Sequence, residues 1–152
     1  MTEVVRTESE DETASVARRT AAGLPPGAIV LLTGDLGAGK TAFVRGMAAG
    51  LGLDPEEVSS PTFALIHEYR PPTGSAHPEP TERRPGRTLV HVDLYRLRGG
   101  EVDDLGLEEL GEGGAVVAIE WAEKLGAAPV GAVRVEIRDC GGDVREISIA
   151  TA

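Results

Sequence analysis

The stretch Gly34-Asp35-Leu36-Gly37-Ala38-Gly39-Lys40-Thr41 decides the fold, because it matches the pattern G-x-x-x-x-G-K-[ST] of a phosphate-binding loop. It follows the continuous apolar run Ala28-Ile29-Val30-Leu31-Leu32, which predicts a strand buried on both faces. After the loop we expect a helix from about Lys40 to Gly50. A buried strand, a glycine-rich turn and a helix in this order are the context that such a loop requires. The sequence therefore predicts a nucleotide site.

The residue types in this loop suit phosphate binding for physical reasons. Glycines let successive backbone N–H groups curl around phosphate oxygens, because a side chain would block that approach. We expect Gly37, Ala38, Gly39, Lys40 and Thr41 to hold the phosphates, with the Thr41 hydroxyl also binding Mg²⁺. ATP is favoured over GTP, because a chain without Asn cannot supply the Asn-Lys-x-Asp motif that is common in guanine-specific proteins of this kind.

Two carboxylates follow predicted strands and are candidates for the metal side of the site. Asp93 directly follows the run 88–92, and Glu120 directly follows the strongly apolar run 115–119. In open α/β sheets, ligands bind at the carboxyl ends of the strands. We therefore expect Asp93 and Glu120 to lie near the Mg²⁺ ion and the triphosphate.

Other polar residues point less clearly to a function. Ser60 and Thr62 flank Pro61 before a predicted strand, where a hydroxyl could sense the γ-phosphate or simply cap a turn. His91 alternates with two valines and is expected to meet a face of the sheet rather than to act in catalysis. Cys140 lies in a predicted turn without a nearby His, so a role as nucleophile is disfavoured.

The rest of the chain predicts a single α/β domain spanning residues 1–152. Ser9 to Glu12 read as a capping box, and the apolar spacing that follows predicts a helix from about Glu10 to Ala22. Pro71 to Arg87 holds five of the ten prolines, and we expect a mobile surface loop whose arginines (Arg83, Arg84 and Arg87) form a solvated cluster. The expected architecture is a three-layer, P-loop NTPase-like fold with a mostly parallel central sheet and antiparallel closing strands. Further expected elements are strands at 63–69, 88–93, 115–119, 133–137 and 144–149, and a short helix at 101–110.

Composition excludes several classes of protein. A single cysteine in 152 residues rules out an intrachain disulfide scaffold. No apolar run approaches the roughly 20 residues that cross a bilayer, and the first twelve residues are acidic, unlike a targeting peptide, so we expect a cytoplasmic protein without a membrane partner. The net charge of −10 disfavours direct binding to a nucleic-acid backbone.

These motifs, in this order, resemble the bacterial TsaE family of ATPases in tRNA threonylcarbamoyladenosine biosynthesis. The resemblance covers about residues 9–121, and the long segment 71–87 departs from it. It implies a MgATP-hydrolysing protein that supports N6-threonylcarbamoyladenosine formation at position 37 of tRNA. It also implies work with the TsaB–TsaD complex, with tRNA contacted only indirectly. The matching motifs are the loop at 34–41, Ser60-Pro61-Thr62-Phe63, His91-Val92-Asp93-Leu94-Tyr95-Arg96-Leu97 and Ile119-Glu120-Trp121.

The resemblance also implies roles for individual residues. Thr41 and Glu120 would bind Mg²⁺, with Asp93 in the Walker B position as a further metal-side residue. Thr13 would approach the adenine or ribose, and Trp121 would pack near the nucleotide. Ser60 and Thr62 would form a switch-like element. The residues expected to act in catalysis are Lys40, Asp93 and Glu120.

Two other functions stay open from the residues alone. A nucleotide-dependent adaptor would need ATP only to select a conformation. A small-molecule kinase would need a lid, for which the segment 71–87 is the only candidate. No convincing arginine finger is visible in the chain, although Arg45 and Arg96 are possible, so a partner is expected to complete the site.

Overall fold

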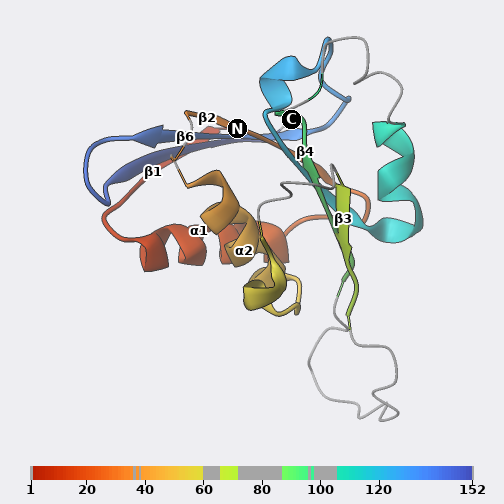
Figure 1. Cartoon of the computed structure of the whole chain (residues 1–152), viewed down its shortest axis with the longest axis horizontal. Coiled ribbons are helices and arrows are strands. Elements are labelled where there is room, and N and C mark those ends of the chain that lie inside the picture. Colours follow the sequence, from red (N-terminus) through yellow and green to blue (C-terminus); the bar gives the residue numbers. More distant parts are fainter. Residues whose placement is uncertain are drawn as a thin grey trace.

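The computed structural model describes residues 2–35, 37, 39–59, 66–71, 87–95, 97 and 106–151. Its strands form one sheet in the order β1-β7-β6-β2-β5-β4-β3 (Figure 1). The strands are β1 (Thr2–Thr7), β2 (Ile29–Gly34), β3 (Ile66–Tyr69), β4 (Leu89–Asp93), β5 (Val116–Glu120), β6 (Val133–Asp139) and β7 (Arg145–Ala150). The helices are α1 (Glu10–Ala22) and α2 (Lys40–Gly50), and the described 3₁₀ helices are η1 (Pro55–Glu57), η3 (Leu107–Gly114) and η4 (Ala122–Lys124).

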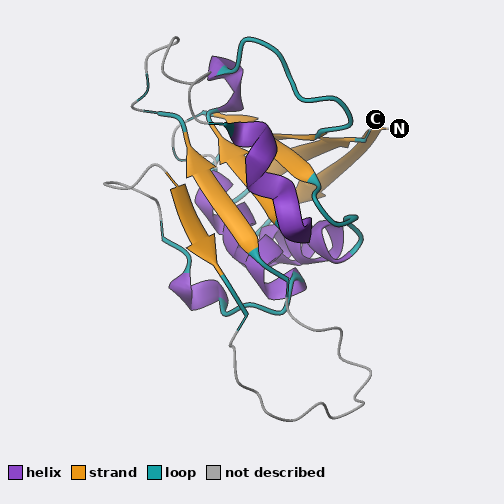
Figure 2. Cartoon of the chain, turned by 90° about the vertical axis from the view of Figure 1, so that its right-hand side faces the viewer, coloured by secondary structure: helices purple, strands orange, loops and turns teal. Residues whose placement is uncertain are grey.

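The pairing of the strands confirms the expected sheet. The central strands β6, β2, β5 and β4 run parallel to one another, whereas β7 and β3 pair antiparallel with the outer two of them and β1 pairs antiparallel with β7. Helices α1 and α2 pack together on one face over an aliphatic core (Figures 1 and 2). The other face carries a second apolar cluster beneath η3 and η4, so the third layer is built from short 3₁₀ helices in the described part of the chain.

Helix α1 has the predicted bounds, and its N-terminus shows why. Ser9 is the N-cap, and its hydroxyl accepts the backbone N–H of Glu12 at 3.1 Å. The Glu12 carboxylate accepts the N–H of Glu8 at 2.8 Å, one residue earlier than in a standard capping box. The N–H groups of Glu8 and Glu12, which have no partner within the helix, thereby gain side-chain acceptors, and this stabilises the first turn of α1.

Strand β1 is an element that the sequence analysis missed. Its residues are mostly exposed, with Val4 61% accessible, so they show none of the buried pattern of a central strand. The strand forms at the sheet edge because β7, from the other end of the chain, offers it a pairing partner. Its last residue also ties it to α1, since the buried hydroxyls of Thr7 and Thr13 lie 2.7 Å apart.

Several other predictions need correction or lie outside the described residues. Of the short helix expected at 101–110, residues 107–110 belong to the 3₁₀ helix η3, and residues 101–105 lie outside the described part. Residues 63–65 and most of the predicted loop, 72–86, also lie outside it. Arg87 was expected to be solvated, but it is half-buried and its Nη1 donates to the Leu24 carbonyl at 2.7 Å. This arginine therefore ties the segment before β4 to the end of α1.

Candidate functional site

The predicted phosphate-binding loop lies between the carboxyl end of β2 and the first residue of α2. Gly37 and Gly39 both have positive φ, at 81° and 105°, a conformation that side chains disfavour and glycine adopts readily. No atom of the described residues lies within 4 Å of the position that a Cβ would take at Gly37, which leaves room for an anion to approach the backbone on that side. Leu36 and Ala38 lie outside the described residues.

The side chain of Lys40 reaches back across this loop to Gly34. The side chain is buried, and its Nζ donates to the Gly34 carbonyl at 2.7 Å. The same ammonium group lies 3.6 Å from the centre of the Trp121 ring, a cation–π contact. Trp121 has φ 60°, a rare conformation for a residue with a side chain, directly after β5. Trp121 thus contacts the loop lysine.

The carboxylates predicted for the metal side are brought together by the sheet. Asp93 and Glu120 are register partners at the carboxyl ends of the parallel strands β4 and β5. The Thr41 hydroxyl donates to Glu120 Oε1 at 3.5 Å, across 79 residues of sequence. Glu120 is only 4% exposed and the contact itself is partly buried, so the loop meets the edge of the core here.

His91 joins this group, although the sequence analysis disfavoured a catalytic role for it. It lies in β4, is fully buried, and donates from Nε2 to Glu120 Oε2 at 2.5 Å. Its Nδ1 has no hydrogen-bond partner among the residues that the structure describes. The sequence did contain an indication of this position. Side chains alternate along a strand, so residues 89, 91 and 93 of β4 share one face, and Asp93 was already a candidate for the site.

Burial, more than the local charges, makes the surroundings of Asp93 unfavourable for a carboxylate. Burial raises the pKa of the Asp93 carboxyl, and the charge of Glu120 raises it further. The backbone N–H of Tyr95, which donates to Asp93 Oδ1 at 2.9 Å, acts against this shift, as do His91 and Lys40. An added cation beside Asp93 and Glu120 would relieve the repulsion between them.

These donors fit Mg²⁺ better than a metal held by protein ligands alone. Within the described residues, no group of three or more His, Cys, Asp or Glu side chains is arranged to hold an ion. Mg²⁺ commonly uses one or two carboxylates and completes its shell with phosphate oxygens and water. A hydroxyl from Thr41 and one carboxylate from Glu120, with Asp93 beside them, match that requirement.

A cavity of about 230 Å³ lies on another side of the loop. It is lined by residues of α1, the loop, α2 and the β6–β7 hairpin, namely Glu10, Thr13, Gly37, Gly39, Ala42, Asp143 and Arg145. Thr13 lines this cavity with its hydroxyl already paired to Thr7. The sequence analysis missed Asp143 and Arg145, because nothing in the sequence shows that the closing hairpin folds back onto the loop.

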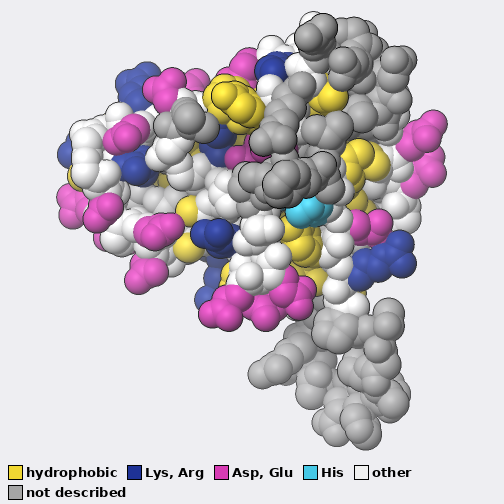
Figure 3. Space-filling view, viewed as in Figure 1, with side chains coloured by type: hydrophobic (Ala, Val, Ile, Leu, Met, Phe, Trp, Pro, Cys, Tyr) yellow, Lys and Arg dark blue, Asp and Glu magenta, His cyan; other side chains and the backbone are white. Residues whose placement is uncertain are grey.

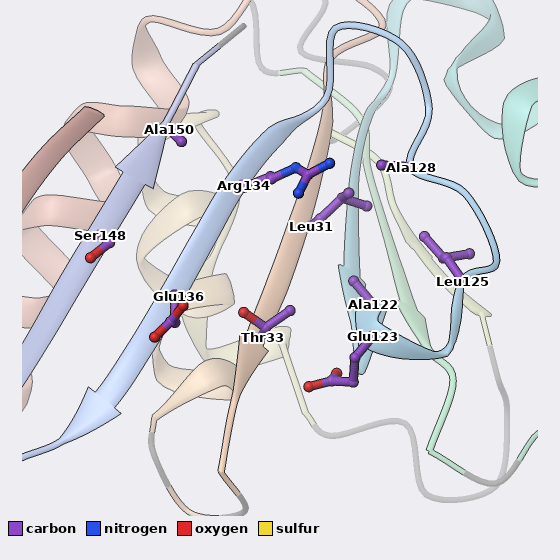
Figure 4. Close-up of a pocket in the computed structure, with 10 residues that line it drawn as sticks. All are labelled: Leu31, Thr33, Ala122, Glu123, Leu125, Ala128, Arg134, Glu136, Ser148 and Ala150. Carbon is purple, nitrogen blue, oxygen red and sulfur yellow. The ribbon is translucent and has the colours of Figure 1, made fainter. Parts of the chain in front are cut away.

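A larger hollow of about 420 Å³ lies elsewhere, on the sheet face opposite α1 and α2 (Figure 4). Side chains of β6 and β7 line one side of it, and residues of and after η4 line the other. It includes no glycine of the phosphate-binding loop. The cavity beside Gly37 and Gly39 is therefore the better candidate for part of a nucleotide site.

Three predicted site residues are not placed by this geometry. Ala38, Ser60 and Thr62 lie outside the described residues, so their assigned roles stay predictions. Arg45, a candidate arginine finger, donates from Nε to the Val58 carbonyl at 3.0 Å and so contacts the segment after η1. Arg96, the other candidate, is outside the described part.

Comparison with known proteins decides the family. The family model "Threonylcarbamoyl adenosine biosynthesis protein TsaE" matches residues 7–147. The chain belongs to the TsaE family. It is 39% identical over 144 residues to the TsaE protein of Bacillus subtilis, covering 94% of this chain and 82% of that one. The TsaE protein of Treponema pallidum is 39% identical over 130 residues, or 84% of each chain.

A solved TsaE-like structure agrees with the fold. The crystal structure of Bacillus subtilis YdiB superposes with a TM-score of 0.71 and 35% sequence identity, over 100% of this chain and 86% of that one. The family match contains every residue of the site described above, from Glu10 to Arg145. In the described part of this TsaE-family chain, every helix is too short or too polar to traverse a bilayer.

Proposed function

We propose that this chain is a MgATP-dependent ATPase of tRNA threonylcarbamoyladenosine biosynthesis, acting with the TsaB–TsaD complex. Membership of the TsaE family gives the biosynthetic process. One observation supports the nucleotide chemistry most directly. The Thr41 hydroxyl contacts the buried Glu120 carboxylate beside the phosphate-binding loop, which joins a metal-binding pair to an anion-binding loop.

In this proposal, the chain's residues mainly bind and orient the triphosphate. The amide groups around Gly37 and Gly39 receive phosphate oxygens, and Lys40 exchanges the Gly34 carbonyl for a phosphate oxygen, which is a stronger acceptor. Mg²⁺, when bound, neutralises charge on the phosphates. Thr41 and Glu120 would hold it, with Asp93 beside them able to orient water. The strained Trp121 keeps the lysine near the loop.

The isolated chain is expected to hydrolyse ATP slowly. In the described part of the chain, the Lys40 ammonium group lies at the loop, whereas the Arg45 guanidinium group donates to the Val58 carbonyl. A cation that stabilises the charge of the transferring phosphoryl group is worth a large factor in rate in related chemistry. In this proposal, the TsaB–TsaD complex supplies the missing group.

The surface charge supports an indirect relation to tRNA. The net charge is −10, and Figure 3 shows acidic side chains interleaved with the basic ones over the described part of that face. Binding to a nucleic-acid backbone relies on clustered Lys and Arg. This distribution of charge suits a protein that acts on tRNA through protein partners better than one that binds tRNA directly.

Calorimetry with MgATP tests the binding part of the proposal. We expect Lys40→Ala to weaken MgATP binding at least ~10-fold, because the loop loses its ammonium group. Lys124→Ala is the matched control, since that ammonium donates to the carbonyls of Tyr95 and Leu97 and not to the loop. Equal MgATP affinity for wild type and Lys40→Ala would contradict the proposed site.

Reconstituted threonylcarbamoyladenosine formation tests the role of hydrolysis. A Glu120→Gln variant should bind nucleotide but lower multiple turnover, because it removes a carboxylate from the metal side. The measurement compares modified tRNA formed by the complete system with wild type, with Glu120→Gln and without this chain. Full activity of Glu120→Gln would favour an adaptor that needs only bound ATP.

A further inference from the structure

Strand β1 lies at an edge of the sheet, and its outer side has no strand partner among the described residues. It pairs with β7 on one side only, and the described sheet ends there (Figure 1). In an antiparallel pair, every second residue turns its backbone N–H and C=O groups toward the neighbouring strand, and the residues between turn theirs away. β1 therefore presents outward-facing backbone donors and acceptors, which can pair with a further strand.

Helix α1 forms the second wall of a groove along this edge. The groove has a volume of about 620 Å³ and is lined by residues of β1 and α1, and we call it the β1–α1 groove. Val5 and Val16 give it an apolar part, and both side chains also pack into the core beneath the sheet. An exposed sheet edge with side-chain pockets beside it is the arrangement that binds extended peptides.

Three arginines make the β1–α1 groove basic in an otherwise acidic protein. Arg6 of β1 and Arg18 and Arg19 of α1 line it, and all three are exposed. In the described part of the chain, none of the three forms an ion pair. The carboxylate that the described lining contains, Glu12, already accepts the backbone N–H of Glu8 at 2.8 Å. The groove is therefore complementary to an anionic partner.

The other features of the groove favour a polypeptide over a nucleic acid as this partner. A phosphate backbone makes no use of the apolar surface of Val5 and Val16 or of the free edge of β1. An extended polypeptide uses both, because its main chain pairs with the edge strand and its alternate side chains enter the groove. The net charge of −10 also opposes the approach of a large polyanion.

We propose that the β1–α1 groove binds an extended acidic segment of another protein, which adds to the sheet beside β1 as a further strand. Carboxylates of the segment meet Arg6, Arg18 and Arg19, and its apolar side chains lie over Val5 and Val16. No residue of the phosphate-binding loop lines this groove. The proposal therefore goes beyond the proposed function and does not depend on nucleotide binding.

A synthetic peptide of alternating Glu and Val residues is the probe, and a peptide of alternating Lys and Val is its charge control. Fluorescence anisotropy of the labelled peptides measures their binding to the full chain. We expect the Lys–Val peptide to bind at least ~10-fold more weakly than the Glu–Val peptide, because the arginines repel it. Failure of wild type to bind the Glu–Val peptide, or equal binding of the two peptides, would overturn the proposal.

Charge reversal places the peptide in the groove. The double variant Arg18→Glu and Arg19→Glu should weaken binding of the Glu–Val peptide at least ~10-fold. Arg138→Glu is the matched control, since that arginine is exposed but lies outside the groove, and it should change the affinity less than ~2-fold. An unchanged melting temperature shows that each variant is folded. Equal losses in the double variant and in Arg138→Glu would contradict the assigned surface.

Hydrogen exchange distinguishes strand addition from a contact between charges alone. Addition of a strand should slow exchange at alternate amides of β1 at least ~10-fold when the Glu–Val peptide is bound. Peptide binding without this protection would overturn the proposal. Unmodified tRNA provides a further arm, because tRNA that displaces the peptide and depends on the same two arginines would assign the groove to nucleic acid instead.

Discussion

Individual side chains at the site form a connected path from the phosphate-binding loop into the core. The path runs from Thr41 to Glu120 and then to His91, which is fully buried. Each carboxylate oxygen of Glu120 thus has a separate partner, one at the loop and one inside the sheet. These two contacts hold the Glu120 carboxylate in one orientation, which is what the proposed Mg²⁺ ligand would need.

We expect His91→Leu to lower Mg²⁺-dependent ATP turnover by about 10-fold, because Glu120 loses the donor that orients it. His91→Gln, which keeps an N–H donor, should recover part of this loss. Titrating turnover with Mg²⁺ separates a weaker apparent Mg²⁺ affinity from a general defect. A folded His91→Leu protein with unchanged Mg²⁺ dependence would show that the histidine is only a core residue.

Asp93 represents the opposite case, a side chain whose charge costs stability. Burial and Glu120 raise its pKa in the folded protein, so ionisation is harder there than in the unfolded chain. The folded state therefore loses stability as the pH rises through the interval between the unfolded and folded pKa values. We expect Asp93→Asn to raise the melting temperature at pH 7 without Mg²⁺, by about 1–3 °C.

Thermal melting in EDTA at several pH values checks this prediction. The gain should shrink as the pH falls and vanish well below the unfolded pKa of about 3.9, where the carboxyl is neutral in both states. The same variant should bind MgATP more weakly, since a carboxylate is lost from the metal side. A wild type that melts higher than Asp93→Asn at pH 7 in EDTA would contradict the assignment.

At the scale of elements, the contact between α1 and α2 depends on two glycines of α2. A Cβ at Gly46 would lie 2.6 Å from the Ala14 carbonyl oxygen, and one at Gly50 would lie 2.3 Å from that of Arg18. Backbone atoms cannot move away cheaply, so the helices approach this closely only because both positions are glycine. This packing also sets Thr13 of α1 beside the loop that precedes α2.

Gly46→Ala should therefore destabilise the protein by about 1–3 kcal/mol, because it forces the two helices apart. Chemical denaturation measures the free energy of unfolding. Gly126→Ala is the matched control and should be nearly neutral, since its φ is not positive and no atom in the described part of the chain lies within 4 Å of its Cβ position. An equally small effect at Gly46 would mean that α1 and α2 are not packed this tightly.

At the scale of the whole molecule, residues from distant parts of the chain meet where the parallel strands have their carboxyl ends. The loop follows β2, the carboxylates of Asp93 and Glu120 end β4 and β5, and Arg145 begins β7. The described chain brings no arginine to the metal side of this assembly, since Arg45 contacts Val58. Full activity is therefore expected to depend on a group from another protein.

ATP turnover should rise at least ~10-fold when the TsaB–TsaD complex is added, because a partner cation would stabilise the charge on the phosphoryl group. A phosphate-release assay with and without the complex measures this. Lys40→Ala serves as the control that assigns the added turnover to this chain rather than to its partners. Equal rates with and without the complex would count against a completed site.

The sequence by itself determined the elements whose cause is local. The glycine-rich turn between β2 and α2, the bounds of α1 with its Ser9 cap, and the apolar strands β2, β4 and β5 follow from glycines, capping residues and hydrophobic runs. The resemblance to the TsaE family followed from four short motifs and is confirmed. These features depend on residues that are close in sequence, so their pattern is visible before folding.

Only the tertiary structure decided how distant residues meet. The His91–Glu120 contact joins positions 29 residues apart, and Thr41–Glu120 joins positions 79 apart. β1 exists as a strand because β7 pairs with it, and Arg145 reaches Gly39 because the closing hairpin turns toward the loop. Strand order, register and side-chain direction fix these contacts, and none of the three is encoded within a short stretch of sequence.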